Sequence, residues 1–159
     1  MSIERARAYL SQMGYADKIQ ELTQSSATVE LAAEALGCKP ERIAKTLSFM
    51  CGETPILIVT AGDAKIDNHK YKSFFGMKAK MLTPEQAETL IGHAVGGVCP
   101  FGVPDNVKTY LDHSLKRFTT VFPACGSSNS AIELTISELE KLSNIVEWID
   151  VCKGYNNET

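Results

Sequence analysis

Two β-prone runs joined by a short turn-like insert constrain the fold more than any other part of the chain. The runs cover residues 46–50 and 56–60, and the residues between them read Cys-Gly-Glu-Thr-Pro. Runs rich in apolar and β-branched residues, separated by a short insert that contains glycine, are typical of an antiparallel hairpin. We therefore expect a β-hairpin over residues 46–60.

Helical signals and shorter strand-like runs lie on both sides of the expected hairpin. Apolar spacing and capping residues predict helices over residues 3–13, 29–36, 40–44, 84–91 and 137–142. Thr28 and Gly37 are expected to begin and end the second helix, and Ser137 with Glu140 to cap the last one. Further strands are predicted over residues 94–98, 107–111, 118–122, 132–135 and 146–151. Short strands interleaved with helices, without regular βαβ repeats, predict an α+β domain with a mixed sheet.

Length and composition fit a single domain over residues 1–159. Hydrophobic residues make up 44% of the chain and charged residues 22%, which is typical of a domain with a buried core. No apolar run approaches the roughly 20 residues that span a bilayer. Charged residues at positions 4, 5 and 7 interrupt the first segment, unlike a signal peptide. We therefore expect a cytoplasmic protein with no membrane segment.

The polar residues form no familiar metal or catalytic motif. Five scattered cysteines include no CxxC pair, and three histidines stand apart from one another, so no metal and no cofactor is expected. GxSxG, Walker and HExxH motifs are absent from the sequence. The net charge of −3 argues against a protein that coats nucleic acid, although a local basic patch could still bind one end of an RNA.

The most unusual local feature is the glycine-rich run GGVCPFG at residues 96–102. Gly96, Gly97 and Gly102 permit a close approach of the backbone, and Pro100 restrains the loop. Such a loop can aim backbone groups at a ligand, as an oxyanion hole requires. A tight turn is the alternative, and composition alone favours it.

Two residues near these features have two interpretations each. Lys45 stands at the entrance of the first hairpin strand, where it is either a solvated strand end or a cation that anchors a phosphate. Cys99 is either a nucleophile or a small residue that lines a site. A cysteine nucleophile needs a base such as His93 or His113 nearby, and because no Cys-His signature surrounds Cys99, the lining interpretation is favoured.

A cluster of lysines and aromatic residues occupies residues 65–80. Interleaved cations and aromatic rings can hold a nucleic-acid backbone and stack on bases. A solvated face is an equal alternative for the lysines, whereas Phe74 and Phe75 are expected to enter the core. The candidate tRNA-binding residues are Lys70, Lys72, Lys78 and Lys80.

Five motifs occur in an order and spacing that resemble the YbaK/EbsC family, which is related to the editing domain of bacterial prolyl-tRNA synthetase. They are TVELAAEALGCKPERIAKTLSF, ILIVTAGDAKID, GGVCPFG, YLDHSL and PACGSSNSAIELTISELEKL. The resemblance covers nearly the whole chain. It implies a largely antiparallel, barrel-like mixed sheet with flanking helices, and hydrolysis of mischarged tRNA without metal or cofactor.

The resemblance also assigns roles to particular residues. Lys45 matches the family's strand-entry lysine, which would contact phosphate or the terminal adenosine. The loop Gly96, Gly97, Val98, Cys99 and Pro100 matches the family's GxxxP loop, whose backbone would hold the aminoacyl group, the ribose and a water. Gly126 matches a later glycine of the pocket, and Gly102 and Ser127 are expected to bind substrate beside it.

The function implied is trans-acting hydrolysis of mischarged aminoacyl-tRNA. The favoured substrate is tRNA for proline that carries alanine or cysteine, cleaved by a positioned water that a ribose hydroxyl assists. Two departures from the family pattern leave the amino acid open. Many relatives have Ser or Thr in place of Cys99, and many have a basic residue within the segment that is Ser127–Ser130 here. The partners expected are the tRNA acceptor end and prolyl-tRNA synthetase. The alternative is a non-catalytic module that binds aminoacyl-tRNA or a synthetase.

Overall fold

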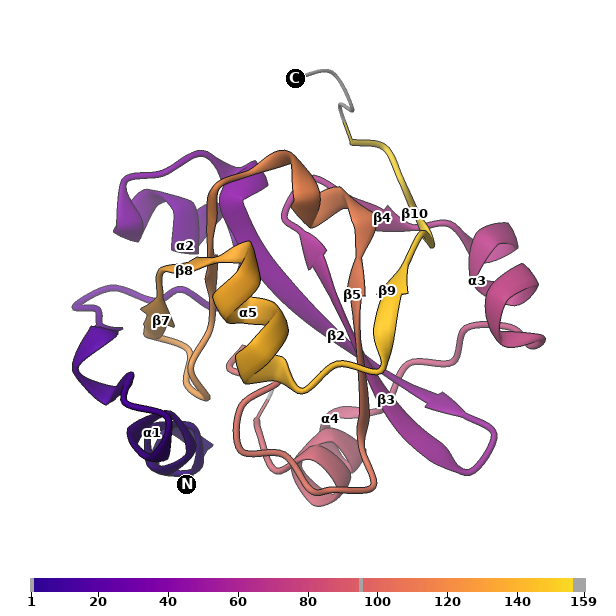
Figure 1. The fold of residues 1–159 in the computed structure, drawn as a ribbon, viewed down its shortest axis with the longest axis horizontal. Coiled ribbons are helices and arrows are strands. Elements are labelled where there is room, and N and C mark those ends of the chain that lie inside the picture. The colour runs from indigo at the N-terminus through magenta and orange to yellow at the C-terminus, as the bar shows by residue number, and fades with distance from the viewer. Residues whose placement is uncertain (1, 95, 156–159) are drawn as a thin grey trace.

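The structure is a computed structural model that describes residues 2–94 and 96–155 (Figure 1). Its α-helices are α1 (Ser2–Gln12), α2 (Val29–Leu36), α3 (Asn68–Phe75), α4 (Pro84–Gln86) and α5 (Ile136–Ser143). Its strands are β1 (Ile19–Glu21), β2 (Ile43–Cys51), β3 (Thr54–Ala61), β4 (Lys65–Ile66), β5 (Lys108–Asp112), β6 (Thr120–Pro123), β7 (Ser130–Ile132), β8 (Leu134–Thr135), β9 (Glu147–Ile149) and β10 (Cys152–Lys153). Short helical turns cover Ala16–Lys18, Pro40–Arg42, Ala87–Ile91 and His113–Arg117.

The main sheet has six strands in the order β8-β6-β2-β3-β5-β9. Antiparallel pairing joins β2 with β3 and β6 with β8, and parallel pairing joins β6 with β2, β3 with β5 and β5 with β9. Two further antiparallel pairs, β1 with β7 and β10 with β4, extend the structure at its margins. The sheet curls into an open half-barrel with helices around it, which confirms the predicted α+β class (Figure 1).

Apolar side chains are buried on both faces of the sheet. Strand β3 lies at the centre of the core, since Leu57, Ile58 and Val59 are fully buried, with Leu57 in a different cluster from the other two. Helix α5 crosses in front of β2 in Figure 1 and buries Leu139 and Leu142 against the sheet. Helix α1 is tied to α5 because the Tyr9 hydroxyl donates a hydrogen bond to the carbonyl of residue 142 at 2.7 Å.

The predicted hairpin is confirmed, and it is longer than expected. Strands β2 and β3 pair from Ala44 with Ala61 to Cys51 with Thr54, so Gly52 and Glu53 alone form the turn. Gly52 has a φ of 65°, a backbone conformation that glycine adopts without strain. Strand β2 already begins at Ile43, because the expected helix over residues 40–44 is only a turn that ends at Arg42. Lys45 therefore lies within the strand.

Local capping signals predicted one helix correctly and misplaced another. Helix α2 begins after Thr28, whose side chain accepts a hydrogen bond from the backbone of Leu31, and it ends at Gly37 with a φ of 69°. In α5 the capping box is formed by Thr135 and Glu138, two residues before the expected pair. The preference for Ser137 was wrong because both pairs have the same spacing.

Several predicted strands differ in extent. The described residues of 94–98 form no strand, and residue 95 lies outside the described residues. The predicted strand over residues 132–135 is divided between β7 and β8, because exposed Glu133 separates two differently paired segments. The runs over residues 107–111, 118–122 and 146–151 correspond to β5, β6 and β9. Helix α3 was not predicted, since its lysines and aromatic residues obscure helical spacing.

Within residues 2–94 and 96–155, no helix combines the length and hydropathy needed to cross a membrane.

Candidate active site

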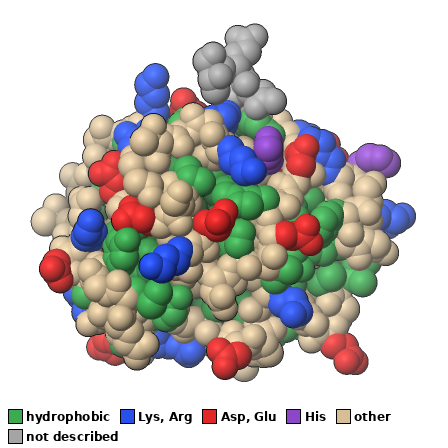
Figure 2. Space-filling view, in the orientation of Figure 1, with side chains coloured by type: hydrophobic (Ala, Val, Ile, Leu, Met, Phe, Trp, Pro, Cys, Tyr) green, Lys and Arg blue, Asp and Glu red, His purple; other side chains and the backbone are tan. Residues whose placement is uncertain are grey.

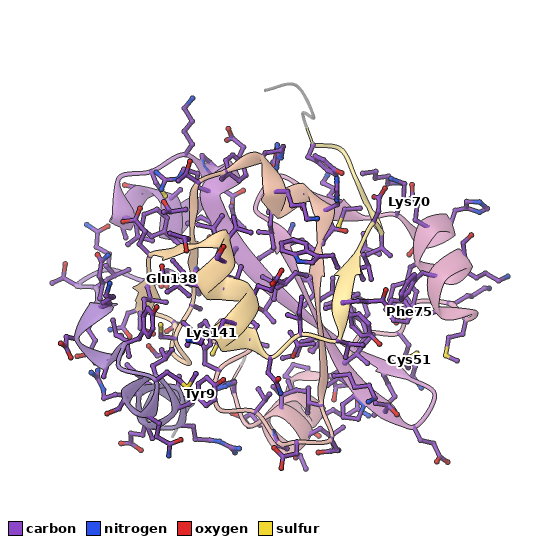
Figure 3. The ribbon with its side chains drawn as sticks, viewed as in Figure 1. Tyr9, Cys51, Lys70, Phe75, Glu138 and Lys141 are labelled. Atoms are coloured by element: carbon purple, nitrogen blue, oxygen red, sulfur yellow. The ribbon has the colours of Figure 1, made fainter. Side chains whose placement is uncertain are left out.

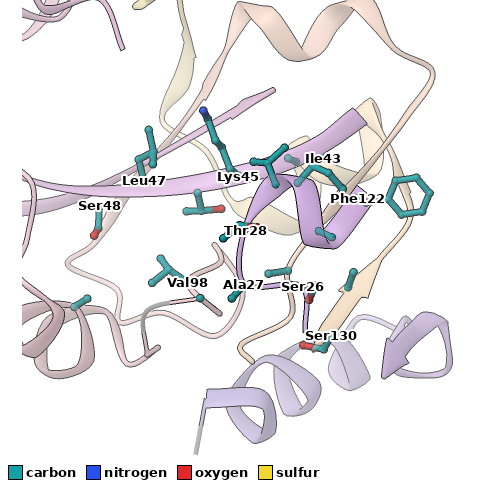
Figure 4. Close-up of a pocket in the computed structure, with 18 of the residues that line it drawn as sticks. Ser26, Ala27, Thr28, Ile43, Lys45, Leu47, Ser48, Val98, Phe122 and Ser130 are labelled. Atoms are coloured by element: carbon teal, nitrogen blue, oxygen red, sulfur yellow. The ribbon is translucent and has the colours of Figure 1, made fainter. Parts of the chain in front are cut away.

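A cavity of about 390 Å³ opens beside the first half of β2 (Figure 4). Four other segments complete its wall: residues 26–32, residues 81–87, the glycine loop, and the β6–β7 region. The lining is mainly apolar, with Ile43, Val98 and Phe122 among its larger side chains. Lys45 is the one charged residue among the described lining residues. The cavity can therefore exclude water from a small group while offering a single cation.

The glycine loop reaches the cavity because its backbone packs against a second glycine segment. A Cβ atom on Gly97 would lie 2.5 Å from the carbonyl carbon of Gly126 and 2.5 Å from the nitrogen of Ser127. Gly96 has a φ of 93° and lies between Ala27 and Ser128. Gly96 and Val98 line the cavity, so the loop presents its backbone there rather than large side chains. The structure thus brings the expected loop and Gly126 together.

Lys45 borders the cavity from β2. Its side chain is half-buried, and burial lowers the pKa of the ammonium, whereas the neighbouring Cys152 and Asp63 act in the opposite direction. In Figure 4 the ammonium points away from Val98, on the other side of β2. The charge therefore lies at the margin of the cavity, where a group outside the apolar interior can meet it.

Cys99 and Pro100 belong to the glycine loop but do not line the cavity. Cys99 is fully buried, and its Sγ lies 3.5 Å from Nε2 of His93. The same His93 nitrogen is 2.8 Å from the carbonyl oxygen of Phe101. Burial raises the pKa of the Cys99 thiol to about 12 and lowers the pKa of His93. A protonated thiol beside a neutral imidazole in the core is a poor nucleophile.

Gly102 and Ser127 also lie outside the lining. Gly102 packs on α1, because a Cβ atom there would lie 2.7 Å from the carbonyl oxygen of Arg5, and the Arg5 Nε donates a hydrogen bond to the Gly102 carbonyl. The Ser127 hydroxyl donates to Ser130 at 2.7 Å, and Ser130 does line the cavity. Ser127 therefore contacts a lining residue without lining the cavity itself.

The candidate tRNA-binding lysines fall into two groups. The Lys70 ammonium donates hydrogen bonds to Asp150 at 3.2 Å and to the carbonyl of Cys152 at 2.9 Å, so it fastens α3 to the C-terminal strand (Figure 3). Lys72, Lys78 and Lys80 are exposed, and Lys80 precedes Met81 of the cavity wall. On the face drawn in Figure 2, cationic and anionic side chains are intermixed without a large area of one sign.

The two phenylalanines of this segment differ in burial. Phe75 packs on Tyr71, with ring centroids 4.5 Å apart, and Figure 3 places it beside the sheet. Phe74 is 44% exposed, so the expectation that it enters the core was wrong. Met77 and Met81, later in the same part of the chain, are also exposed, by 38% and 57%.

Sequence reasoning missed the hydroxyl groups of the cavity. Ser26, Thr46, Ser48 and Ser130 line it, and the hydroxyls of Ser26 and Thr46 are buried with no partner among the described residues. Serines in loops usually indicate turns, so only the position of Thr46 beside Lys45 could have drawn attention to this set. Among the described residues, no three His, Cys, Asp or Glu side chains are arranged to hold a metal ion.

The family model for the aminoacyl-tRNA editing domain matches residues 23–142. The chain belongs to the aminoacyl-tRNA editing domain family. The uncharacterized protein YwhH of Bacillus subtilis (strain 168) is 54% identical to this editing-domain protein over 156 residues, which cover 98% of this chain and 99% of YwhH. EbsC of Enterococcus faecalis (strain ATCC 700802 / V583), named as a candidate Cys-tRNA(Pro)/Cys-tRNA(Cys) deacylase, is 29% identical over 74% of this chain and 73% of its own length.

Solved structures of the editing-domain family share this fold. One, described as a candidate trans-editing enzyme for prolyl tRNA synthetase, has a TM-score of 0.87 and 30% identity, and the match covers 96% of this chain and 98% of that one. The predicted resemblance to EbsC-type proteins and to editing proteins of the prolyl system is thereby confirmed.

Proposed function

We propose that this editing-domain protein hydrolyses mischarged aminoacyl-tRNA in trans, in the cytoplasm, with tRNA for proline as the carrier of a small noncognate amino acid such as alanine or cysteine. The observation that carries the proposal is the contact of Gly97 with the backbone of Gly126 and Ser127 at the edge of a mainly apolar cavity. This contact supports a loop whose backbone, rather than a reactive side chain, meets the substrate.

The chemistry needs only positioning. An aminoacyl ester is already activated, and a neighbouring hydroxyl of the terminal ribose can assist the attacking water. Holding ester, hydroxyl and water in reactive geometry can lower the barrier by several kcal/mol. Rigid backbone groups add electrostatic stabilisation of the developing charge. Gly96, Gly97 and Val98 supply that backbone, and Pro100 restrains it from behind.

Lys45 is assigned to the nucleic acid. Its ammonium is at the margin of the cavity and its burial leaves it less solvated than an ordinary lysine, so a phosphate or the terminal adenosine placed there would gain a strong partner. Lys72, Lys78 and Lys80 would contact the acceptor stem outside the cavity. Residues 68–80 include no acidic residue, although the chain has a net charge of −3. Lys70 would contribute least, because its ammonium already has two acceptors.

The test is release of the amino acid under multiple-turnover conditions. The purified protein at nanomolar concentration is incubated with tRNA for proline charged with alanine or with cysteine, and loss of the ester is followed with time. We expect many esters cleaved per protein molecule. Tight binding of the charged tRNA without release would identify a non-catalytic module that holds aminoacyl-tRNA or a synthetase, and would overturn the proposal.

A further inference from the structure

Two hydroxyl groups of the cavity have no hydrogen-bond partner among the described residues. Among the described residues, five buried side-chain polar atoms have no hydrogen-bond partner, and two of them, on Ser26 and Thr46, belong to residues that line the cavity. Buried polar groups in proteins are nearly always hydrogen-bonded, and each exception calls for an explanation. A ligand that enters the cavity can supply the missing partner.

Ser26 is held firmly in this position. Its backbone N–H donates to the carbonyl of Ser128 at 2.5 Å, and the N–H of Leu22 donates to the carbonyl of Asn129 at 2.6 Å. The pairing of β1 with β7 continues this contact along the chain. The side chain is only 9% exposed. Its hydroxyl is therefore largely shielded from the outer surface of the molecule.

Small side chains predominate among the lining residues near Ser26 in the sequence. Ala27 and Ala32 line the cavity with it, as does Ala131, and Figure 4 shows Ser26 beside Ala27 and Ser130. The Ser130 hydroxyl already has a partner in Ser127. No carboxylate or amide side chain occurs among the described lining residues. The Ser26 hydroxyl is thus one of a few polar groups in a mainly apolar wall, and it has no partner among the described residues.

We propose that Ser26 recognises the side chain of the aminoacyl group, and that the protein prefers esters of serine, threonine or cysteine to the alanine ester. This inference rests on the proposed deacylase function. A small side chain with a hydroxyl or thiol gives the Ser26 hydroxyl its missing partner, whereas alanine leaves it buried and unpaired. A site that pairs with a polar substrate group disfavours an analogue that lacks the group.

The experiment compares kcat/KM for tRNA for proline charged separately with alanine, serine, threonine and cysteine. The wild-type protein is expected to cleave at least one of the three polar esters about ten times more efficiently than the alanine ester. Ser26→Ala is expected to reduce that ratio to within about twofold, since the polar ester loses a hydrogen bond that the alanine ester never makes.

Ser143→Ala is the matched control. Ser143 is on α5, 2% exposed, and its hydroxyl is likewise unpartnered among the described residues, but it does not line the cavity. Its substitution should leave the ratio unchanged. The thermal midpoint of Ser26→Ala should stay near that of the wild type, because the hydroxyl has no internal hydrogen bond to lose.

The outcomes separate this inference from the proposed function. If the wild type cleaves the alanine ester as fast as all polar esters, or if Ser26→Ala keeps the wild-type ratio, the role of Ser26 is wrong while the deacylase function stands. If none of the four esters is cleaved, both proposals are overturned. The wild-type panel decides the preference even if Ser26→Ala does not fold.

Discussion

Gly97 and Gly126 lie back to back at the edge of the cavity, with no space for a side chain between them. A Cβ atom on Gly97 would lie 2.5 Å from the Gly126 carbonyl carbon, closer than real contacts allow. We therefore expect Gly97→Ala to separate the two segments, to lower kcat/KM for deacylation at least about tenfold, and to cost about 1–3 kcal/mol of stability. Urea unfolding and a deacylation assay measure the two effects.

Gly14→Ala is the control for this substitution. Gly14 has a φ of 82°, and a Cβ atom added to it would meet nothing within 4 Å, so this variant suffers backbone strain of about 1–2 kcal/mol without crowding. It should lose stability and keep its turnover. Equal turnover in both variants would show that the close contact at Gly97 is not needed for the reaction.

Removing the cation of the cavity should impair the reaction more than the fold. Lys45→Ala deletes an ammonium that burial leaves less solvated than an ordinary lysine, and the pKa of this group is lowered for the same reason. We expect a fall of roughly 10²-fold in kcat/KM for deacylation, with thermal stability close to that of the wild type. Lys141→Ala, at an exposed position of α5, is the control. Near wild-type turnover in Lys45→Ala would remove Lys45 from the site.

Cys99 is expected to be dispensable for catalysis. Its thiol is fully buried, with a pKa raised to about 12, and it faces His93 in the core. Cys99→Ala should therefore keep deacylation within a few-fold of the wild type, although the lost side chain should lower stability by about 1 kcal/mol. Loss of nearly all activity in a variant that remains folded would restore the nucleophile hypothesis.

The Cys99 thiol is also expected to make the free energy of unfolding depend on pH. Unfolded cysteine loses its proton near pH 8.5, whereas folded Cys99 keeps its proton to about pH 12. Between these values the folded state binds more protons than the unfolded state, so stability falls as pH rises, by about 1.4 kcal/mol per pH unit for this group. Buried Cys125 and Cys152 have raised pKa values and act in the same direction.

Urea unfolding between pH 8 and pH 10 measures this slope. Cys99→Ala should show a shallower decline than the wild type, because one of the retained protons has been removed. Identical slopes in the two proteins would mean that the Cys99 thiol titrates alike in the folded and unfolded chains.

The exposed lysines are expected to act through salt-sensitive binding. Lys78→Ala combined with Lys80→Ala should raise KM for charged tRNA several-fold at low salt and reduce the dependence of KM on salt, because fewer phosphate contacts are formed. Lys70→Ala should change stability more than KM, since its ammonium holds Asp150 and the Cys152 carbonyl. A salt dependence equal to that of the wild type in the double variant would exclude this surface as the tRNA contact.

The sequence predicted those parts of the fold that depend on neighbours in the chain. The hairpin and the ends of α2 followed from Thr28, Gly37 and the runs around Gly52, because turns and caps are satisfied within a few residues. The prediction of a strand over residues 94–98 was wrong because it depended on apolar character alone. Gly96 and Gly97 pack against segments that are distant in the sequence, and the described residues of this run form no strand.

The structure places part of the predicted set of residues at the cavity, and their roles stay predictions. Lys45 and Gly96 line the cavity, and Gly97 packs against Gly126 beside it. The direction of Cys99 into the core depends on His93 and Phe101, and the position of Gly102 depends on Arg5. Such long-range packing leaves no periodic mark in the sequence, and neither do the unpartnered hydroxyls of Ser26 and Thr46.

The hydrogen bond from Ser26 to Ser128 joins two segments that are synthesised at different times. The segment around Ser26, which forms one side of the cavity, leaves the ribosome about 100 residues before the segment around Ser128, with which it pairs. Lys45 and the glycine loop therefore emerge while that wall still has no partner, and the cavity closes only when β7 has been synthesised. A nascent chain can thus hold every charged and glycine residue of the site and still be unable to enclose an amino acid.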